Sequence, residues 1–251
     1  MYTEIDKEID RSLVEADTHT HTVASTHAYS TVYEMAQFAA RAGLKGIVIT
    51  DHGPMLPDGA HSWHFGNLRS LPPYICGVRV LHGAEANVID YDGHIDLEDR
   101  YQRELDWIVA SFHDPTLTPG SIEDHTRAYL ALAENPYIDV IGHSGSEIFK
   151  YDYERVLPVF KEKGKFVEIN SHSFAARVGA AVNCREIALI CKKYDIPVVV
   201  NSDAHTCFSV GDVKEAFRML SEIDYPTGLI INMHFENLAR YIENKRKRKI
   251  I

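Results

Sequence analysis

Short apolar runs alternate with helical patterns along nearly the whole chain. Six runs have the length and the Val and Ile content of strands that are buried on both faces, and turn or cap residues bound each of them. These runs span residues 46–50, 78–85, 107–112, 138–142, 166–170 and 197–201. The apolar pair Leu13 and Val14 before Asp17 marks the end of a further, first strand. Because strands of a parallel sheet read as continuous apolar runs, the pattern predicts a parallel α/β fold.

Helical patterns separate the runs. Thr31 and Glu34 have capping-box spacing ahead of apolar residues at i, i+3, i+4 and i+7, and Gly43 ends this helix. Later helices are expected in residues 98–105, 121–132, 156–163, from an N-cap at Asn183, in residues 213–220 and up to about Arg248, with a short apolar run at residues 229–231. Residues 54–73 are rich in Pro, Gly, His and aromatic residues and are expected to form a long functional loop.

Strands that alternate with helices imply a parallel sheet, and seven or eight such units in 251 residues favour a TIM-like barrel. A doubly wound open sheet is the alternative, but it gives no obvious reason for many ligand-type residues at strand ends. No linker or internal repeat divides the sequence. Residues 1–251 are therefore expected to form a single domain, with residues 1–12 as an N-terminal extension.

Composition and charge limit the classes of molecule that the protein is expected to bind. Hydrophobic residues make up 45% and charged residues 25% of the chain, as in ordinary soluble domains. The net charge of -10 disfavours long nucleic acid and anionic membranes, which select basic surfaces. The basic run at residues 245–249 is interpreted as cations at a helix C-terminus. Four irregularly spaced cysteines, no secretory signal and no membrane-length apolar run predict a cytoplasmic protein. A homo-oligomer is not predicted.

Candidate metal ligands occur at the ends of successive predicted strands. His19 and His21 form a His-x-His motif, and strand alternation places both side chains on one face. Five more candidates lie at the ends of later strands: His52, Glu85, His113, His143 and His205. Two others lie near these residues in the sequence, His27 after His21 and Asp203 before His205. In a parallel barrel these strand ends meet at one face, so seven imidazoles and two carboxylates would converge. That set exceeds what one tetrahedral ion needs and suits two or three ions. Hydrogen-bonded histidines at a barrel rim are the alternative.

Hydrolysis of a phosphate ester is the chemistry that this cluster suits best. Adjacent divalent ions can turn a bound water into hydroxide, clamp the phosphoryl oxygens and stabilise the leaving alkoxide. Histidine and carboxylate ligands without cysteine suit zinc, and also manganese or iron. Asp17 and Asp51 either orient ligating imidazoles or cap loops.

Three further side chains join Glu85 and Asp203 in the predicted catalytic set. Arg69 and Arg177 follow the long loop and the sixth strand, and a guanidinium group can bind two phosphate oxygens at once. Surface ion pairs are the alternative for both. His64 is a candidate donor of a proton to the leaving group, with aromatic loop packing as its alternative. His172 is a weaker candidate at the site.

These motifs resemble the PHP family, named for polymerase and histidinol phosphatase, and within it the bacterial YcdX-type phosphatases. The resemblance rests on Asp17, His19 and His21, on residues 50–53, 83–87, 112–113, 142–145 and 202–205, and for the subgroup on residues 63–65, 67–69 and 170–185. It covers nearly all of the chain after about residue 14, and all nine expected ligand positions are filled. The longer N-terminus and Ser144, where the family usually has proline, depart from the pattern without removing a ligand.

The resemblance implies a distorted (β/α)7 barrel and a trinuclear site that hydrolyses a small phosphorylated metabolite. By this analogy one ion would take His19, His21, Glu85 and Asp203, a second Glu85, His113 and His143, and a third His27, His52 and His205. Three divalent ions are expected, with zinc first. Histidinol phosphate or short oligonucleotides as substrates, amide or lactone hydrolysis, and a non-catalytic metal-binding role stay open as alternatives.

Overall fold

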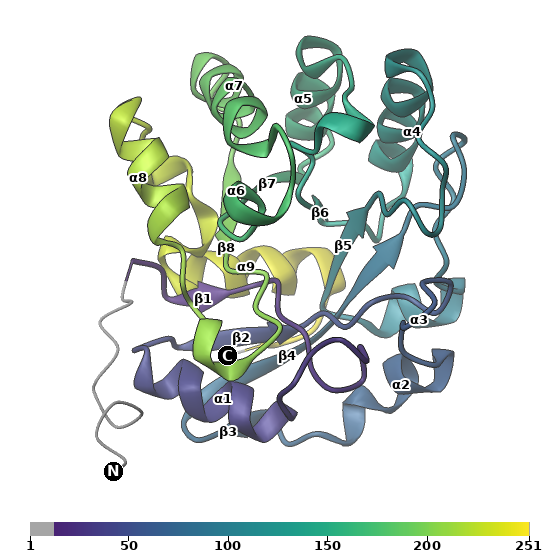
Figure 1. The fold of residues 1–251 in the computed structure, drawn as a ribbon. Coiled ribbons are helices and arrows are strands. Elements are labelled where there is room, and N and C mark those ends of the chain that lie inside the picture. Colours follow the sequence, from purple (N-terminus) through teal and green to yellow (C-terminus); the bar gives the residue numbers. More distant parts are fainter. Residues whose placement is uncertain (1–12, 251) are drawn as a thin grey trace.

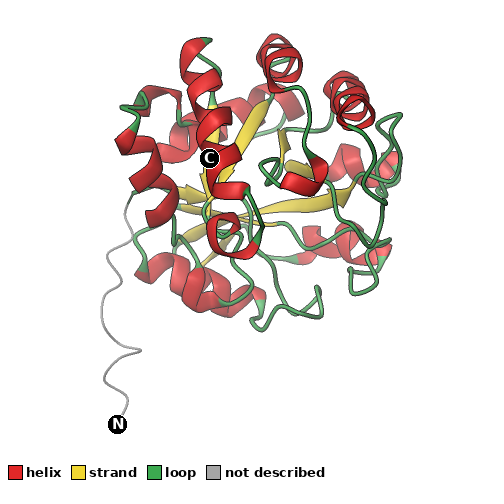
Figure 2. Ribbon diagram, turned by 45° about the horizontal axis from the view of Figure 1, so that its top comes forward, coloured by secondary structure: helices red, strands yellow, loops and turns green. Residues whose placement is uncertain are grey.

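Seven parallel strands form a ring that helices surround (Figures 1 and 2). The computed structural model describes residues 13–250, so the expected extension at residues 1–12 lies outside the described part. The strands follow the order β1 (Ala16–Asp17), β2 (Gly46–Ile49), β4 (Val78–Asn87), β5 (Trp107–Ser111), β6 (Val140–Ile141), β7 (Phe166–Asn170) and β8 (Val198–Asn201). A two-residue strand, β3 (Tyr74–Ile75), pairs antiparallel with β4. The six apolar runs and the segment that follows Leu13 and Val14 therefore form the seven parallel strands.

The ring nearly closes between β8 and β1. Just beyond the two strands, the backbone N–H of His21 donates to the carbonyl oxygen of Ala204 at 2.8 Å. Further down, the buried side chain of Asn232 lies between the strands and donates to the carbonyl oxygens of Ala16 at 2.8 Å and Val200 at 2.7 Å. Its own oxygen accepts from the backbone N–H of Val200 at 3.0 Å. The predicted barrel is confirmed, and the open-sheet alternative is wrong because the two edge strands meet.

The interior of the barrel is apolar at one end and polar at the other. Its apolar core combines Ala16, Val48, Leu81, Trp107, Val109, Val140, Phe166 and Val199 with Phe235, Leu238, Ala239 and Ile242 of α9 (Phe235–Arg246). Trp107 and Phe166 are the first residues of their strands, so α9 covers the N-terminal end. A Cβ atom on Gly46 would lie 2.3 Å from the Phe235 ring, so only glycine fits there. The C-terminal ends of the strands remain for the functional side chains.

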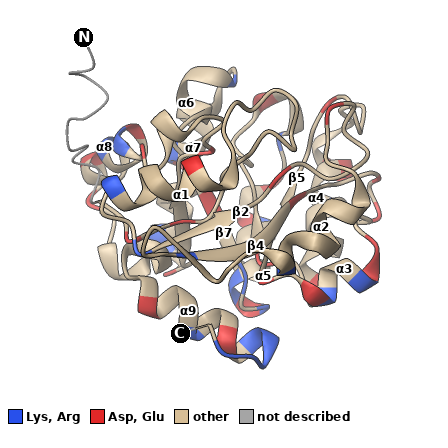
Figure 3. Cartoon of the chain, turned by 90° about the horizontal axis from the view of Figure 1, so that it is seen from below, with Lys and Arg blue, Asp and Glu red and all other residues tan. Residues whose placement is uncertain are grey.

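Helices alternate with the strands as predicted. They are α1 (Val32–Arg41), α2 (Ser62–Asn67), α3 (Asp99–Glu104), α4 (Ile122–Glu134), α5 (Tyr153–Glu162), α6 (Ser173–Ala176), α7 (Ala180–Lys193), α8 (Lys214–Glu222) and α9. The capping box of Thr31 and Glu34 is present. The basic run ends α9 as predicted, and Figure 3 shows Lys and Arg gathered there. No helix within residues 13–250 has the length and apolar character to cross a membrane.

Two sequence-based expectations about helices were wrong. Helix α7 begins at Ala180, because Gly179 ahead of it adopts a left-handed conformation with φ of 75° and starts the helix one turn early. The side chain of Asn183 does not cap the helix and donates instead to the Gly145 carbonyl oxygen at 3.0 Å. The expected loop at residues 54–73 contains α2, because the His61 side chain accepts a hydrogen bond from the backbone N–H of Trp63.

Candidate metal centre

The carboxylate of Glu85 lies at the centre of the predicted ligands. This fully buried side chain projects from β4 at the C-terminal end of the barrel. Its Oε2 atom lies 2.7 Å from His52 Nδ1 and 3.3 Å from His19 Nε2. Its Oε1 atom lies 2.8 Å from His143 Nε2 and 3.5 Å from His113 Nε2. Glu85 thus faces two groups of imidazoles, one through each oxygen.

Three of the predicted ligands can share one ion, and Asp203 lies beside them. The Oδ1 atom of Asp203 lies 3.1 Å from His21 Nε2 and 3.5 Å from His19 Nε2, and Glu85 Oε2 lies 3.5 Å from His21 Nε2. Ligands about 2.0 Å from a tetrahedral ion lie about 3.3 Å from one another. His19, His21 and Glu85 therefore present ligand atoms close enough to share a cation, and Asp203 lies against both imidazoles.

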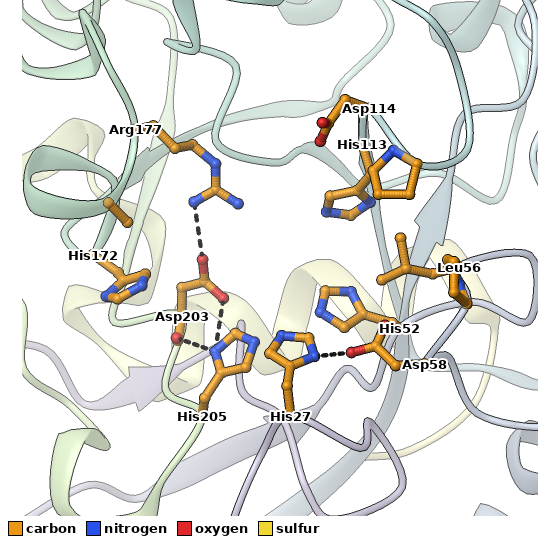
Figure 4. Close-up of a pocket in the computed structure, with 13 residues that line it drawn as sticks. His27, His52, Leu56, Asp58, His113, Asp114, His172, Arg177, Asp203 and His205 are labelled. Carbon is orange, nitrogen blue, oxygen red and sulfur yellow. Dashed lines mark hydrogen bonds and ion pairs between the residues drawn. The ribbon is translucent and has the colours of Figure 1, made fainter.

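Of the remaining predicted ligands, His143 is buried beside Glu85, and the other four line a pocket of about 680 Å³ (Figure 4): His27, His52, His113 and His205. The His27 ring lies 4.5 Å from the His205 ring and 5.1 Å from the His52 ring, measured between centroids. His27 is half exposed, and its Nδ1 atom contacts the carboxylate of Asp58. The side chains of His21, His52 and His205 present nitrogen atoms close enough to share an ion. The rings of the third expected set therefore lie side by side, but within the described residues it is His21, not His27, that groups with His52 and His205.

Several of these atoms are buried without a hydrogen bond. His19 Nε2, Glu85 Oε2 and His113 Nε2 are shielded from solvent, and despite the short distances between them they are not aligned as donor and acceptor. Buried polar atoms are nearly always paired, so these unpaired nitrogen and oxygen atoms indicate that a further binding partner belongs between them. Imidazole and carboxylate groups turned toward a common point fit one or more divalent ions.

The electrostatics favour the metal-binding forms of Glu85 and His143, whereas for His19 and His52 the neighbouring carboxylates outweigh burial and raise the pKa. Burial raises the pKa of Glu85, but the imidazoles of His19, His113 and His52 outweigh it and hold that pKa well below the ordinary range. Burial together with the Arg177 guanidinium lowers the pKa of His143 to about 4. A carboxylate anion and a neutral imidazole are the forms that coordinate cations.

Two residues that the sequence analysis did not single out orient the ligands. The carboxylate of Glu168 accepts a hydrogen bond from His19 Nδ1 at 2.8 Å, and the Asn87 side-chain oxygen accepts one from His113 Nδ1 at 2.7 Å. Each bond leaves the Nε2 atom of its imidazole free to face the cluster. A charged residue within the buried run 166–170 was the one sequence signal for Glu168, because charges inside apolar strands are rare unless paired.

Asp17 and Asp51, for which the sequence left two roles open, form hydrogen bonds to neighbouring loops. Asp17 accepts hydrogen bonds from the backbone N–H of Ser202 at 3.3 Å and from its hydroxyl. Asp51 accepts from the Thr22 backbone at 2.7 Å and from the Ser25 hydroxyl at 2.8 Å. Both carboxylates therefore fix the loops that carry the ligands, which is the loop-capping alternative.

The two predicted arginines lie in different places. Arg177 lines the pocket, where its guanidinium lies 3.5 Å from Asp203 Oδ2 (Figure 4). Arg69 is 77% exposed, lies 3.9 Å from Glu104 and lines a separate hollow beside α2 and α3. Only Arg177 is brought to the metal ligands.

The predicted proton donor also lies to one side. The Nε2 atom of His64 lies 3.1 Å from Asp51 Oδ2, and the ring lines the same separate hollow as Arg69. His172, the weaker candidate from the sequence, lines the pocket beside the metal ligands, with its ring 6.2 Å from that of His205. The role of His64 in catalysis stays a prediction.

Comparison with known proteins assigns the family. The model of the PHP domain matches residues 17–172. A probable phosphatase of Acetivibrio thermocellus is 46% identical over 232 residues, which cover 92% of this chain and 96% of that protein. A probable phosphatase of Caldanaerobacter subterraneus subsp. tengcongensis is 47% identical over 234 residues, 92% of each.

The fold has a counterpart among solved structures. Histidinol phosphate phosphatase from Lactococcus lactis, solved with zinc, L-histidinol and phosphate, superposes with a TM-score of 0.56 over 84% of this chain and 94% of that chain, at 16% identity. From the domain match and its two close relatives, this chain belongs to the PHP family.

Proposed function

We propose that this chain is a metal-dependent phosphatase that hydrolyses a small phosphorylated metabolite at a trinuclear site. The observation that carries the proposal is the position of Glu85, whose two oxygens face separate groups of imidazoles within 3.5 Å. A carboxylate placed in this way suits a ligand shared by two ions. The names of the two close relatives support the reaction class.

The nine residues divide into three sets. His19, His21, Glu85 and Asp203 would hold one ion, Glu85 with His113 and His143 a second, and His27, His52 and His205 a third. When bound, divalent ions acidify water and neutralise charge on phosphoryl oxygens. Zinc is the first metal to test, because the ligands are imidazoles and carboxylates and because the solved histidinol phosphate phosphatase contains it. Manganese and iron come next.

The other pocket residues bind and orient the substrate. The Arg177 guanidinium, 25% exposed and beside Asp203, is placed to bind phosphoryl oxygens. Leu56, Pro57 and Pro115 supply apolar walls for the rest of the molecule. His172 is better placed than His64 to give a proton to the leaving oxygen, because it lines this pocket. The pocket of about 680 Å³ suits a metabolite rather than long nucleic acid, which the charge of -10 also disfavours.

The cellular setting follows from the sequence. A cytoplasmic location is part of the proposal, and it agrees with the four cysteines, which are all free thiols.

The proposal is tested by phosphatase assays on purified protein with and without a chelator. The substrate panel contains phosphomonoesters, histidinol phosphate, short oligonucleotides, and an amide and a lactone as carbonyl substrates. We expect two to three metal equivalents per chain by elemental analysis, activity on phosphomonoesters, and loss of that activity on chelation with recovery on adding metal. Full activity in metal-stripped protein would overturn the mechanism, and a fully metallated protein without any esterase activity would favour a metal-binding role alone.

A further inference from the structure

The carboxylate of Glu168 lies beneath the metal ligands, in β7, and is only 1% exposed. Its Oε1 atom accepts hydrogen bonds from His19 Nδ1 at 2.8 Å and from the Asn201 side-chain amide at 2.9 Å. Its Oε2 atom accepts from the backbone N–H of His143 at 2.6 Å and from the Asn170 side-chain amide at 3.2 Å. One buried side chain therefore contacts two predicted ligands directly.

A third ligand is reached through Asn170. The same amide group that donates to Glu168 also donates to Asp203 Oδ2 at 3.1 Å. Glu168 thus connects ligands from three separate segments, the ends of β1, β6 and β8. His19 and Asp203 belong to the same proposed set of four, so Glu168 supports mainly that set.

We propose that Glu168 is a positioning residue that fixes His19, His143 and Asp203 in the geometry needed for metal binding. This inference rests on the proposed metal site. The bond from His19 Nδ1 holds the proton on that nitrogen and leaves Nε2 as the electron-pair donor that faces Glu85 at 3.3 Å. The bond from the His143 backbone stabilises a residue whose φ of 28° is unfavourable for any side chain other than glycine.

Only a carboxylate satisfies this environment. The four groups that face Glu168 in the described part of the chain are donors, and an ionised carboxylate offers acceptors in all directions. A glutamine has the same shape, but its NH₂ group would face either the backbone N–H of His143 or the imidazole of His19. In the second case His19 would accept at Nδ1 and carry its proton on Nε2, where no metal can bind.

The test compares metal binding by wild-type protein and Glu168→Gln. Both are equilibrated with zinc against a competing chelator and analysed for metal equivalents per chain. We expect Glu168→Gln to bind one ion 10- to 100-fold more weakly, as is typical when a group that orients a metal ligand is lost, while the other ions are retained. The matched control is Asp139→Asn, which alters another fully buried carboxylate at the start of β6, near α9. It is expected to lower the melting temperature with unchanged metal content.

A second measurement needs no variant. Long-range ¹H–¹⁵N NMR spectra of zinc-loaded wild-type protein should show His19 protonated at Nδ1, with Nε2 carrying the metal. A metal-bound Nδ1 would overturn the inference, as would a Glu168→Gln protein that is folded and binds zinc with wild-type affinity and stoichiometry. If the wild-type protein binds no metal at all, the proposed function fails instead, so the two failures are distinguishable.

Discussion

Under the proposed function, single side chains divide the pocket into groups that would hold metal and groups that would bind substrate. Arg177 is the cation that lies among the ligands, 3.5 Å from Asp203, whereas Arg69 pairs with Glu104 on the outside of the barrel. A guanidinium beside the metal ligands can bind the phosphoryl group as it arrives, and one on an outer helix cannot. The two arginines therefore form a matched pair for mutagenesis.

Arg177→Ala is expected to lower kcat/KM for a phosphomonoester about 10- to 100-fold, since a hydrogen bond to a charged group contributes about 1.5–3 kcal/mol. Arg69→Ala should change kcat/KM by less than about twofold, as for an exposed ion pair. Steady-state kinetics check both variants, and elemental analysis confirms that Arg177→Ala keeps its metal. An equal loss in the two variants would show that Arg177 has no special place at the site.

Among the elements, the barrel depends on how its first and last strands are joined. Strands β1 and β8 do not pair along their length, and the side chain of Asn232 provides the connection near their base. Helix α9 follows directly and covers the end of the barrel with Phe235. The position of β1 matters for function because His19 and His21 follow it immediately.

Asn232→Ala is expected to lower the free energy of unfolding by about 2–4 kcal/mol. The substitution leaves the carbonyl oxygens of Ala16 and Val200 and the N–H of Val200 buried without their present partner. Chemical denaturation measures the change. The control Asn237→Ala removes an exposed side chain from α9 and should stay within about 0.5 kcal/mol of wild type. Equal stabilities of the two variants would contradict the bridging role.

For the whole molecule, stability depends on charges buried where α9 meets the barrel. Burial and the nearby cations Lys245 and Arg246 lower the pKa of Lys165. They outweigh the opposing effect of the carboxylates of Asp139 and Glu134, so the pKa lies at about 7. Below about pH 7 the side chain is charged in both the folded and the unfolded chain, and the cost of burying the charge is present in full. Between pH 7 and its ordinary pKa of 10.5, only the unfolded chain keeps the proton.

The free energy of unfolding should therefore gain a contribution from Lys165 that increases with pH, by up to about 1.4 kcal/mol per pH unit between pH 7 and 10.5. Lys165→Met is expected to lose this slope, whereas Lys163→Met, which alters a lysine paired with Glu134 at the surface, should keep it. Denaturation curves at several pH values measure the slopes. A slope unchanged in Lys165→Met would mean that Lys165 keeps its ordinary affinity for protons.

The amino-acid sequence by itself determined the alternation of strands and helices and the ligand types at the strand ends. Both follow from local patterns, because a buried parallel strand is largely apolar and the functional residues of a barrel lie at or just beyond the C-terminal ends of its strands. The sequence therefore predicted the barrel and the nine residues from His19 to His205 that the fold gathers.

Tertiary structure alone decided which side chains complete the site. Arg69 and Arg177 had equal standing in the sequence, but the direction of each loop put only Arg177 in the pocket. Glu168 and Asn232 act through partners distant in the chain, and no local pattern encodes such contacts. A hydrogen bond across a barrel depends on where the strands come together in space, and that position exists only once the chain has folded.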